Sequence, residues 1–186
     1  KAAQVLFGLD RDDITAKDHA ELKELLIQSG PTHEFRVRAQ VLARLLAESA
    51  EMASAQGETA TAIDCNLKAL HLLLDVLLRC EEIERMDFTP TVESVVAALT
   101  GVDLPSETSL GLMNHYERQG EFVKAEDQLF VMLRSGALGA GLNHLGEGFY
   151  QRLMEQPDWA LMEGGLPRDE VESGWEEFRE QAKQSA

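Results

Sequence analysis

The chain has 186 residues, a length suited to a single domain that buries about 70% of the surface exposed in the unfolded chain, so it needs neither disulfide bonds nor a metal to hold together. Acidic residues number 33 against 17 lysines and arginines, and the net charge of −16 disfavours nucleic acid and anionic membrane surfaces as partners. A hydrophobic content of 44% is too high for a disordered acidic chain.

The cysteines and the apolar runs favour a cytoplasmic location. Cys65 and Cys80 lie on one predicted helix, about 22 Å apart at 1.5 Å per residue, which is too far for a bond within that helix. We therefore expect reduced, buried thiols. The longest apolar run, residues 67–78, contains charges and is too short to cross a membrane. Residues 1–9 do not resemble a signal peptide, although the first residue is not Met and we expect an upstream helix to be missing.

The first predicted elements are short helices. Residues 1–8 have the pattern of the last turns of a helix that Gly8 terminates. Thr15 as an N-cap, with Asp18 in the first turn, predicts a second helix that ends at residues 30–31.

The next elements form a predicted pair of long helices. Apolar residues at spacings of three and four predict a helix over residues 35–57 and a central helix over 58–80, with an apolar arc wide enough to contact more than one neighbour. Thr89 as a cap, followed by Pro90, predicts a short helix that ends near Leu99.

The second half of the chain repeats this arrangement. Helices are predicted over residues 106–119 and 122–133, with a tight turn at Gly120. A loop or cap at residues 135–141 leads to a helix that Pro157 ends. The last helix opens at Pro167, and its apolar stripe comprises Val171, Trp175, Phe178 and Ala182. No segment alternates apolar and polar residues, so we predict an all-α fold of about eight or nine helices and no sheet.

One stretch resembles a tetratricopeptide repeat. Gly120 takes the place of the turn, and residues 106–133 give the best match. The residues at the packing positions of the two helices are Leu112, Tyr116, Phe122, Ala125, Leu129 and Met132. A weaker copy surrounds Gly57, which lies 63 residues earlier, whereas regular repeats recur about every 34 residues.

Nearly the whole chain resembles an uncharacterised bacterial family of tetratricopeptide-like proteins, described only as a domain of unknown function. The resemblance is carried by residues 6–10, 124–130 and 164–168. It implies a single domain over residues 1–186, built from antiparallel helix pairs in a right-handed array, and it implies no activity.

The resemblance also implies a partner groove. Tetratricopeptide proteins commonly bind a peptide or helix along their first helices, which here places the groove beside Leu110, Asn114, Glu117 and Arg118. Some family members bind a C-terminal carboxylate through Lys and Asn one turn apart. Leu110 stands at the lysine position, and the corresponding residues of the earlier pair are Ala47 and Glu51. We therefore do not expect a carboxylate clamp.

No catalytic, metal or cofactor site is expected. The Glu-x-x-His and His-Glu-x-x-His patterns are absent, and His71 is interpreted as a helix-packing residue. His144 and Glu147 form a one-turn surface pair in the same interpretation. The glycines of residues 136–141 match no phosphate-binding spacing, and burial should make the Cys65 thiol inert.

The C-terminal aromatic residues leave two interpretations open. They are Trp159, Trp175, Phe149 and Phe178. The favoured interpretation is a terminal core that caps the helical array. Alternatively, Trp175 and Phe178 anchor a second copy of the chain.

Three functions follow from these observations. The leading prediction is a non-enzymatic scaffold or adaptor for a protein or peptide, with a basic or amphipathic partner suiting the negative charge. The second is a structural homo-oligomer whose groove is filled by another copy. The third is a small-molecule receptor or enzyme with a deep pocket that gathers His71, His115 or several buried acids.

Overall fold

The protein is all-helical in the part of the chain that its structure describes. The computed structural model describes residues 2–27, 32–79, 86–136 and 140–184, which contain eleven α-helices and no strand. The all-α prediction is confirmed for these ranges. The expected number of eight or nine helices is too low. The helix Arg11–Ala16 was not predicted, and for residues 159–162 the sequence predicts only a short turn where the helix Asp158–Glu163 is present.

The chain forms two compact units, Lys1–Asp103 and Leu104–Ala186, which we call unit 1 and unit 2. The sequence predicts one domain over residues 1–186, and that remains a prediction.

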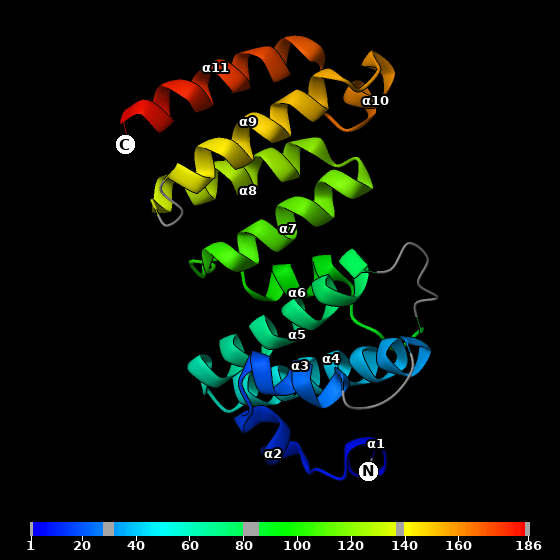
Figure 1. The fold of residues 1–186 in the computed structure, drawn as a ribbon. Helices are drawn as coiled ribbons and strands as arrows, with labels where there is room; N and C mark the ends of the chain where they lie inside the picture. The colour runs from blue at the N-terminus through cyan, green and yellow to red at the C-terminus, as the bar shows by residue number, and fades with distance from the viewer. Residues whose placement is uncertain (1, 28–31, 80–85, 137–139, 185–186) are drawn as a thin grey trace. The chain divides into compact units, whose positions relative to one another are not determined.

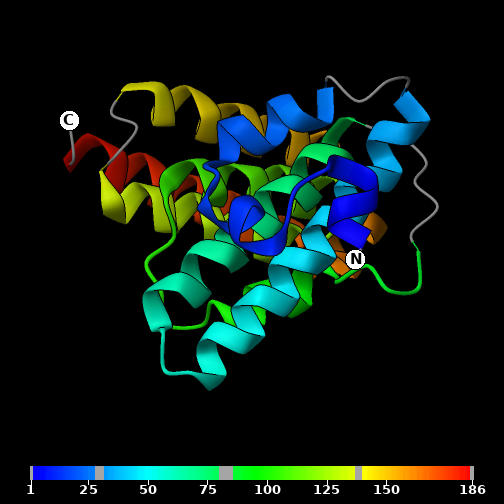
Figure 2. The ribbon, with the colours of Figure 1, turned by 90° about the horizontal axis from the view of Figure 1, so that it is seen from below.

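Unit 1 is organised around an antiparallel helix pair. The helices α4 and α5 pack along their length and are joined by a turn at Gly57, whose φ of 78° lies in the left-handed region that glycine adopts at little cost (Figure 1). Figure 2 shows the same pair from below. The helices of the unit are α1 (Ala2–Phe7), α2 (Arg11–Ala16), α3 (His19–Ile27), α4 (Thr32–Ala55), α5 (Thr59–Arg79) and α6 (Val92–Ala98).

The N-terminal caps of α2 and α3 differ from the predicted cap at Thr15. Asp10 caps α2 in a capping box, with its side chain accepting from the Asp13 backbone N–H at 2.9 Å and Asp13 accepting in return. Asp18 and Glu21 make the same reciprocal pair at the start of α3. Thr15 therefore is not an N-cap; it lies inside α2. Aspartate is as good a cap as threonine, and the acidic residue three positions later completes each box.

The start of α6 was also misplaced by two residues. Thr91 caps this helix by accepting from the Ser94 backbone N–H at 2.9 Å. Thr89 is instead buried, and its hydroxyl donates to Gln40 Oε1 at 2.8 Å. A contact with a residue 49 positions away decides the role of Thr89, and no local pattern reveals it.

The core of unit 1 combines leucine with alanine. Small side chains at Ala39, Ala43 and Ala50 are buried on α4, which lets the axes of α4 and α5 approach closely. Lys68 is buried on α5, where its ammonium donates to the Thr15 carbonyl at 2.8 Å and thereby ties α5 to α2.

Unit 2 contains a second helix pair followed by three helices. The predicted helix, turn and helix around Gly120 are present, with a φ of 75° at Gly120 and with Ala125 fully buried (Figure 1). Behind this pair, α11 packs against α8, α9 and α10. The helices are α7 (Ser106–Gln119), α8 (Phe122–Ser135), α9 (Ala140–Met154), α10 (Asp158–Glu163) and α11 (Arg168–Gln184).

The aromatic core of unit 2 lies between α8, α9 and α11. Phe149, Tyr150 and Phe178 are fully buried, and the Tyr150 ring stacks on Trp175 with 6.0 Å between centroids. These four residues fit the interpretation of a C-terminal core. Trp159 does not, because it is 69% exposed on α10.

Candidate functional site

The predicted groove residues all lie on α7 but have different environments. Leu110 and Asn114 are half-buried, and Arg118 is exposed. Glu117 forms a bidentate ion pair with Arg152 of α9, at 2.5 Å and 2.9 Å. These hydrogen bonds raise the pKa of Arg152. Glu117 therefore helps to join α7 to α9, and a partner would compete with Arg152 for it.

A hollow of about 730 Å³ lies in unit 1, between α4, α5 and α6. Its lining is mostly small: Ala47, Ala50, Ala62 and Ala98 contribute methyl groups. Arg44 and Glu51 are the charged residues in this lining. We call this space the α4–α6 hollow. Ala47 and Glu51, the positions at which the sequence argued against a carboxylate clamp, line this hollow. The four predicted groove residues of α7 do not line it.

The amino-acid sequence of α4 explains why a hollow forms. Ala47 and Ala50 are three residues apart and therefore share a helix face, and neither fills the space that a leucine would fill. Arg44 is held aside by Glu48, whose carboxylate accepts from Arg44 Nε at 2.8 Å. Ser54 and Thr59, on either side of the α4–α5 turn, contribute small polar groups. The result is a space lined both by apolar side chains and by hydrogen-bonding groups.

A second hollow of about 530 Å³ lies between α4 and the chain around α2. Arg11 crosses its edge, donating from Nε to Ser49 Oγ at 2.8 Å and from Nη1 to Met52 Sδ at 2.7 Å. Arg44 and Glu51 line both hollows. The smaller hollow is therefore occupied at its edge by contacts that attach α2 to α4.

A titratable cluster joins α3 to α5 in unit 1. Asp75 lies 3.1 Å from Lys23 Nζ and 3.6 Å from His19 Nε2, and the rings of His19 and His71 meet edge to face at 4.8 Å. Burial raises the pKa of Asp75, but the hydrogen bonds and charges of His19 and Lys23 outweigh it and lower the pKa to about 2. The cluster thus holds an ionised carboxylate between two helices.

This cluster does not have the geometry of a metal site. Within the described ranges, no three or more His, Cys, Asp and Glu side chains are placed to hold a metal ion. An ammonium beside Asp75 also opposes the binding of a cation there. The contact between His71 and His19 agrees with the interpretation of His71 as a packing residue.

Unit 2 contains a half-buried acid, Glu126, that the sequence did not single out. Tyr150 donates its hydroxyl proton to Glu126 Oε1 at 2.6 Å. Burial is the main cause that raises the pKa of Glu126, and the pKa of Tyr150 is also raised, first by burial and then by its bond to Glu126. Gly174 provides the space, because a side chain there would meet both groups. The pair joins α8 to α9 beneath α11.

Beside this pair, the half-buried Trp175 is held by charged groups. Trp175 Nε1 donates to Glu147 Oε2 at 3.0 Å, and Arg179 lies over its ring at 4.1 Å while pairing with Glu147. The hydrogen bonds from Arg179 lower the pKa of Glu147. Glu147 therefore bonds to α11, whereas the sequence paired it with His144 at the surface.

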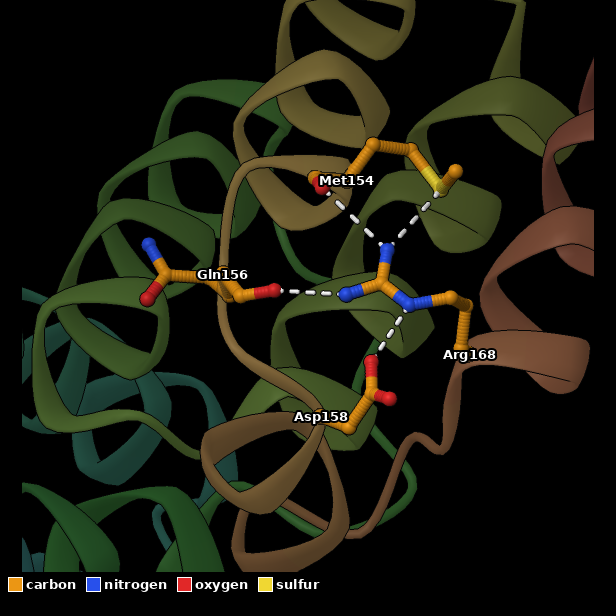
Figure 3. Close-up of polar contacts among 4 residues, drawn as sticks. All are labelled: Met154, Gln156, Asp158 and Arg168. Atoms are coloured by element: carbon orange, nitrogen blue, oxygen red, sulfur yellow. Dashed lines mark hydrogen bonds and ion pairs between the residues drawn. The ribbon is translucent and has the colours of Figure 1, made fainter.

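Arg168 fixes the segment that contains α10. Figure 3 shows its guanidinium reaching three parts of the chain: Nη2 donates to the Gln156 carbonyl at 2.7 Å, Nη1 to the Met154 carbonyl at 3.2 Å, and Nε to Asp158 at 2.5 Å. Met154 is the last residue of α9 and Gln156 lies just after it, where backbone acceptors have no helical donor. One side chain at the start of α11 thus closes the end of α9 and holds the start of α10.

Close backbone packing fixes the other end of α10. A side chain at Gly164 would meet the Gly120 carbonyl and the Phe122 ring, and the Val123 backbone N–H donates to the Gly164 carbonyl at 3.3 Å. The turn between α7 and α8 therefore packs directly against the end of α10.

Two side chains of α10 form an exposed apolar surface that sequence analysis missed. Trp159 and Met162 are 69% and 70% exposed, whereas Leu161 is fully buried. A usable signal was present: a helix of six residues between Pro157 and Gly164 can bury only one face, and Leu161 takes it.

Comparison with known proteins identifies the family. Residues 9–183 match the family of unknown function DUF6483. The chain belongs to this family. The expectation of an uncharacterised family is thereby confirmed, and Arg168 and Gly164, within the stretch 164–168 that suggested it, have the structural roles described above. No curated protein and no solved structure matches the chain.

The described helices lack the features of a membrane span. None of those within the described ranges combines sufficient length with sufficient apolar character to cross a bilayer.

Proposed function

We propose that this protein is a non-enzymatic, cytoplasmic scaffold or adaptor, built from tetratricopeptide-like helix pairs in a right-handed array, that binds a protein or peptide in the α4–α6 hollow. The observation that carries the proposal is the hollow itself, about 730 Å³ and lined in part by four alanines. That volume lies within the range of about 300–1,000 Å³ typical of binding sites, and it accommodates several side chains of a helix or extended peptide.

The lining favours binding over catalysis. Arg44 and Glu51 are its charged residues, and Arg44 already pairs with Glu48. Catalysis by proton transfer or nucleophilic attack needs a positioned acid, base or nucleophile within reach of a substrate. Binding needs only a complementary apolar surface with a few polar groups, which Ser54, Thr59 and Asn66 supply.

The charge of the chain selects the class of partner. A net charge of −16 attracts basic segments and repels nucleic acid. Glu51 at the edge of the hollow offers a carboxylate to a lysine or arginine of the partner. The proposed ligand is therefore an amphipathic segment that is apolar on one side and basic on the other.

A pair of neighbouring alanines provides a matched test. Ala98 lines the hollow and Ala97 does not, and both are exposed on α6. Partners would be captured from native cell extract, identified by mass spectrometry, purified, and titrated against the wild type, A98W and A97W. We expect A98W to weaken binding at least tenfold by filling the hollow, and A97W to leave the dissociation constant unchanged.

Other outcomes would count against the proposal. Equal effects of A98W and A97W would place the partner elsewhere. A dimer in light scattering that dissociates in A98W but not in A97W would assign the hollow to a second copy of the chain. Turnover of a small molecule that A98W abolishes would make the protein an enzyme.

A further inference from the structure

Trp159 and Met162 form a second apolar surface, in unit 2, which we call the α10 surface. They are three residues apart on one helix and therefore project from the same side. Both are about 70% exposed, at 69% and 70%. Tryptophan is the residue type most enriched among the energetically dominant positions of protein interfaces. Within α10, Leu161 is the buried side chain, whereas Trp159 and Met162 expose adjoining apolar surface to solvent.

The α10 surface is held rigidly. Arg168 fixes the start of the helix through Asp158 and the Gln156 carbonyl (Figure 3). At the other end, Gly164 packs against the Gly120 carbonyl. Side chains that are fixed before binding lose less conformational entropy when a partner arrives, so a rigid platform binds more tightly than a mobile loop with the same residues.

The charges around the α10 surface are acidic. Glu155, Asp158 and Glu163 are all exposed, and residues 153–167 contain no lysine or arginine. Asp158 is paired with Arg168, whereas Glu155, four residues before Trp159, and Glu163, the residue after Met162, are exposed to a partner. An apolar centre with an acidic edge is complementary to an apolar stripe with a basic edge.

We propose that the α10 surface binds a basic amphipathic segment of another protein. Charge complementarity favours this occupant over a second copy of the chain, because the same acidic edge would face itself across a symmetric dimer. The same acidic edge opposes contact with anionic lipid. The inference goes beyond the α4–α6 hollow, with which this surface shares no residue.

The test uses the full chain and two labelled synthetic peptides. Both peptides have about 18 residues with the same leucine stripe, and their polar faces carry lysine in one and glutamate in the other. Fluorescence anisotropy would measure binding to the wild type, to W159S/M162S and to F88S. Phe88 is a matched control because it is an exposed aromatic residue in unit 1, 45% exposed.

The lysine peptide should bind the wild type and F88S equally, and W159S/M162S roughly tenfold or more weakly. E155Q/E163Q should weaken binding of the lysine peptide several-fold in low salt and leave the fold intact. This variant tests the acidic residues separately from the apolar residues that W159S/M162S replaces. The α4–α6 hollow is proposed to bind the same class of peptide, so the comparison is repeated in the A98W background, where the hollow is filled. The loss caused by W159S/M162S should persist there. If only A98W lost binding, the peptide would bind in the α4–α6 hollow. If only W159S/M162S lost binding, the peptide would bind at the α10 surface.

Several results would overturn the inference. One is that the lysine peptide fails to bind the wild type, and another is that the glutamate peptide binds the wild type as tightly as the lysine peptide does. A third is that peptide binding weakens equally in F88S and W159S/M162S. Self-association that W159S/M162S abolishes would assign the surface to a second copy. Binding to phosphatidylcholine vesicles that the same variant abolishes would assign it to a lipid surface.

Discussion

The ring of Phe178 in α11 occupies the space that a side chain on Gly146 of α9 would fill. Phe178 is 1% exposed and packs against Tyr150, with 6.0 Å between ring centroids. The absence of a side chain at Gly146 is therefore what lets α9 and α11 approach each other. It also limits Phe178 as an anchor for a second copy, since the ring is already covered within unit 2.

Gly146→Ala should destabilise the protein. Adding a methyl group to this contact forces Phe178 or the helix backbone to move, which costs about 1–3 kcal/mol. Alanine itself favours a helix over glycine by up to about 1 kcal/mol, so the net loss is expected to be smaller than the packing cost. Urea unfolding followed by circular dichroism would measure it.

Gly148→Ala is the matched control, on the same helix. A side chain there would meet the flexible end of Arg152, at 3.3 Å. The expected result is a gain of about 0.5–1 kcal/mol from the higher helix propensity of alanine. If both variants were equally stable, the packing of α9 against α11 described here would be wrong.

Arg168→Ala should loosen α10 more than Asp158→Asn does. The alanine variant loses donors to the Met154 and Gln156 carbonyls and costs about 1–3 kcal/mol, whereas the exposed ion pair with Asp158 contributes less than about 1 kcal/mol. Hydrogen exchange would show faster exchange of the α10 amides in Arg168→Ala.

Arg168→Lys distinguishes charge from geometry. Lysine keeps the positive charge but cannot reach both carbonyls and Asp158 with a planar fork. We expect its stability to be closer to that of Arg168→Ala than to the wild type. Full stability in the lysine variant would mean that only the charge matters.

Local patterns were sufficient for the helix pairs. The apolar spacing on both sides of Gly57 and Gly120 predicted α4, α5, α7 and α8, because periodicity and a left-handed glycine are properties of neighbouring residues. The prediction of Cys65 as a buried thiol is confirmed, and burial raises its pKa. Cys80 lies outside the described residues.

Features that depend on distant contacts were not predicted. Thr89 was taken as a helix cap because nothing local shows its bond to Gln40. Trp159 was assigned to a core because hydrophobicity alone does not tell which face of a short helix is covered. The α4–α6 hollow was missed for a similar reason: alanines that line a space and alanines that close it have the same sequence pattern.

Glu126→Gln should change the pH dependence of stability. The pKa of Glu126 is raised above its ordinary value of 4.5 in the folded protein, so folding favours the protonated form. Below pH 4.5 the carboxyl is protonated in both states. As the pH rises through the raised pKa, the wild type must bury a charge and loses stability relative to Glu126→Gln.

Urea unfolding of both proteins between pH 4 and 8 would measure this difference. Glu180→Gln, an exposed residue on α11 that is not among the charges raising the pKa of Glu126, controls for the loss of one negative charge. A wild type that gained stability relative to Glu126→Gln with rising pH would contradict the effect of burial on Glu126.

Asp75→Asn should have the opposite pH dependence to Glu126→Gln, because the wild type gains stability relative to this variant as the pH rises. The pKa of Asp75 is lowered from 3.8 to about 2, despite the raising effect of burial, because His19 and Lys23 stabilise its charge. The wild type therefore gains stability from this carboxylate above pH 3.8 and loses it as the pH falls through about 2.

Near pH 7 the asparagine variant should be about 1–2 kcal/mol less stable, a value reduced for the partial exposure of Asp75. The difference should shrink between pH 3.8 and pH 2, measured by urea unfolding. Lys23→Met removes the nearest cation, so Asp75→Asn should cost less in that background at neutral pH. An equal cost in both backgrounds would show that Lys23 does not stabilise Asp75 and that the carboxylate depends on other partners.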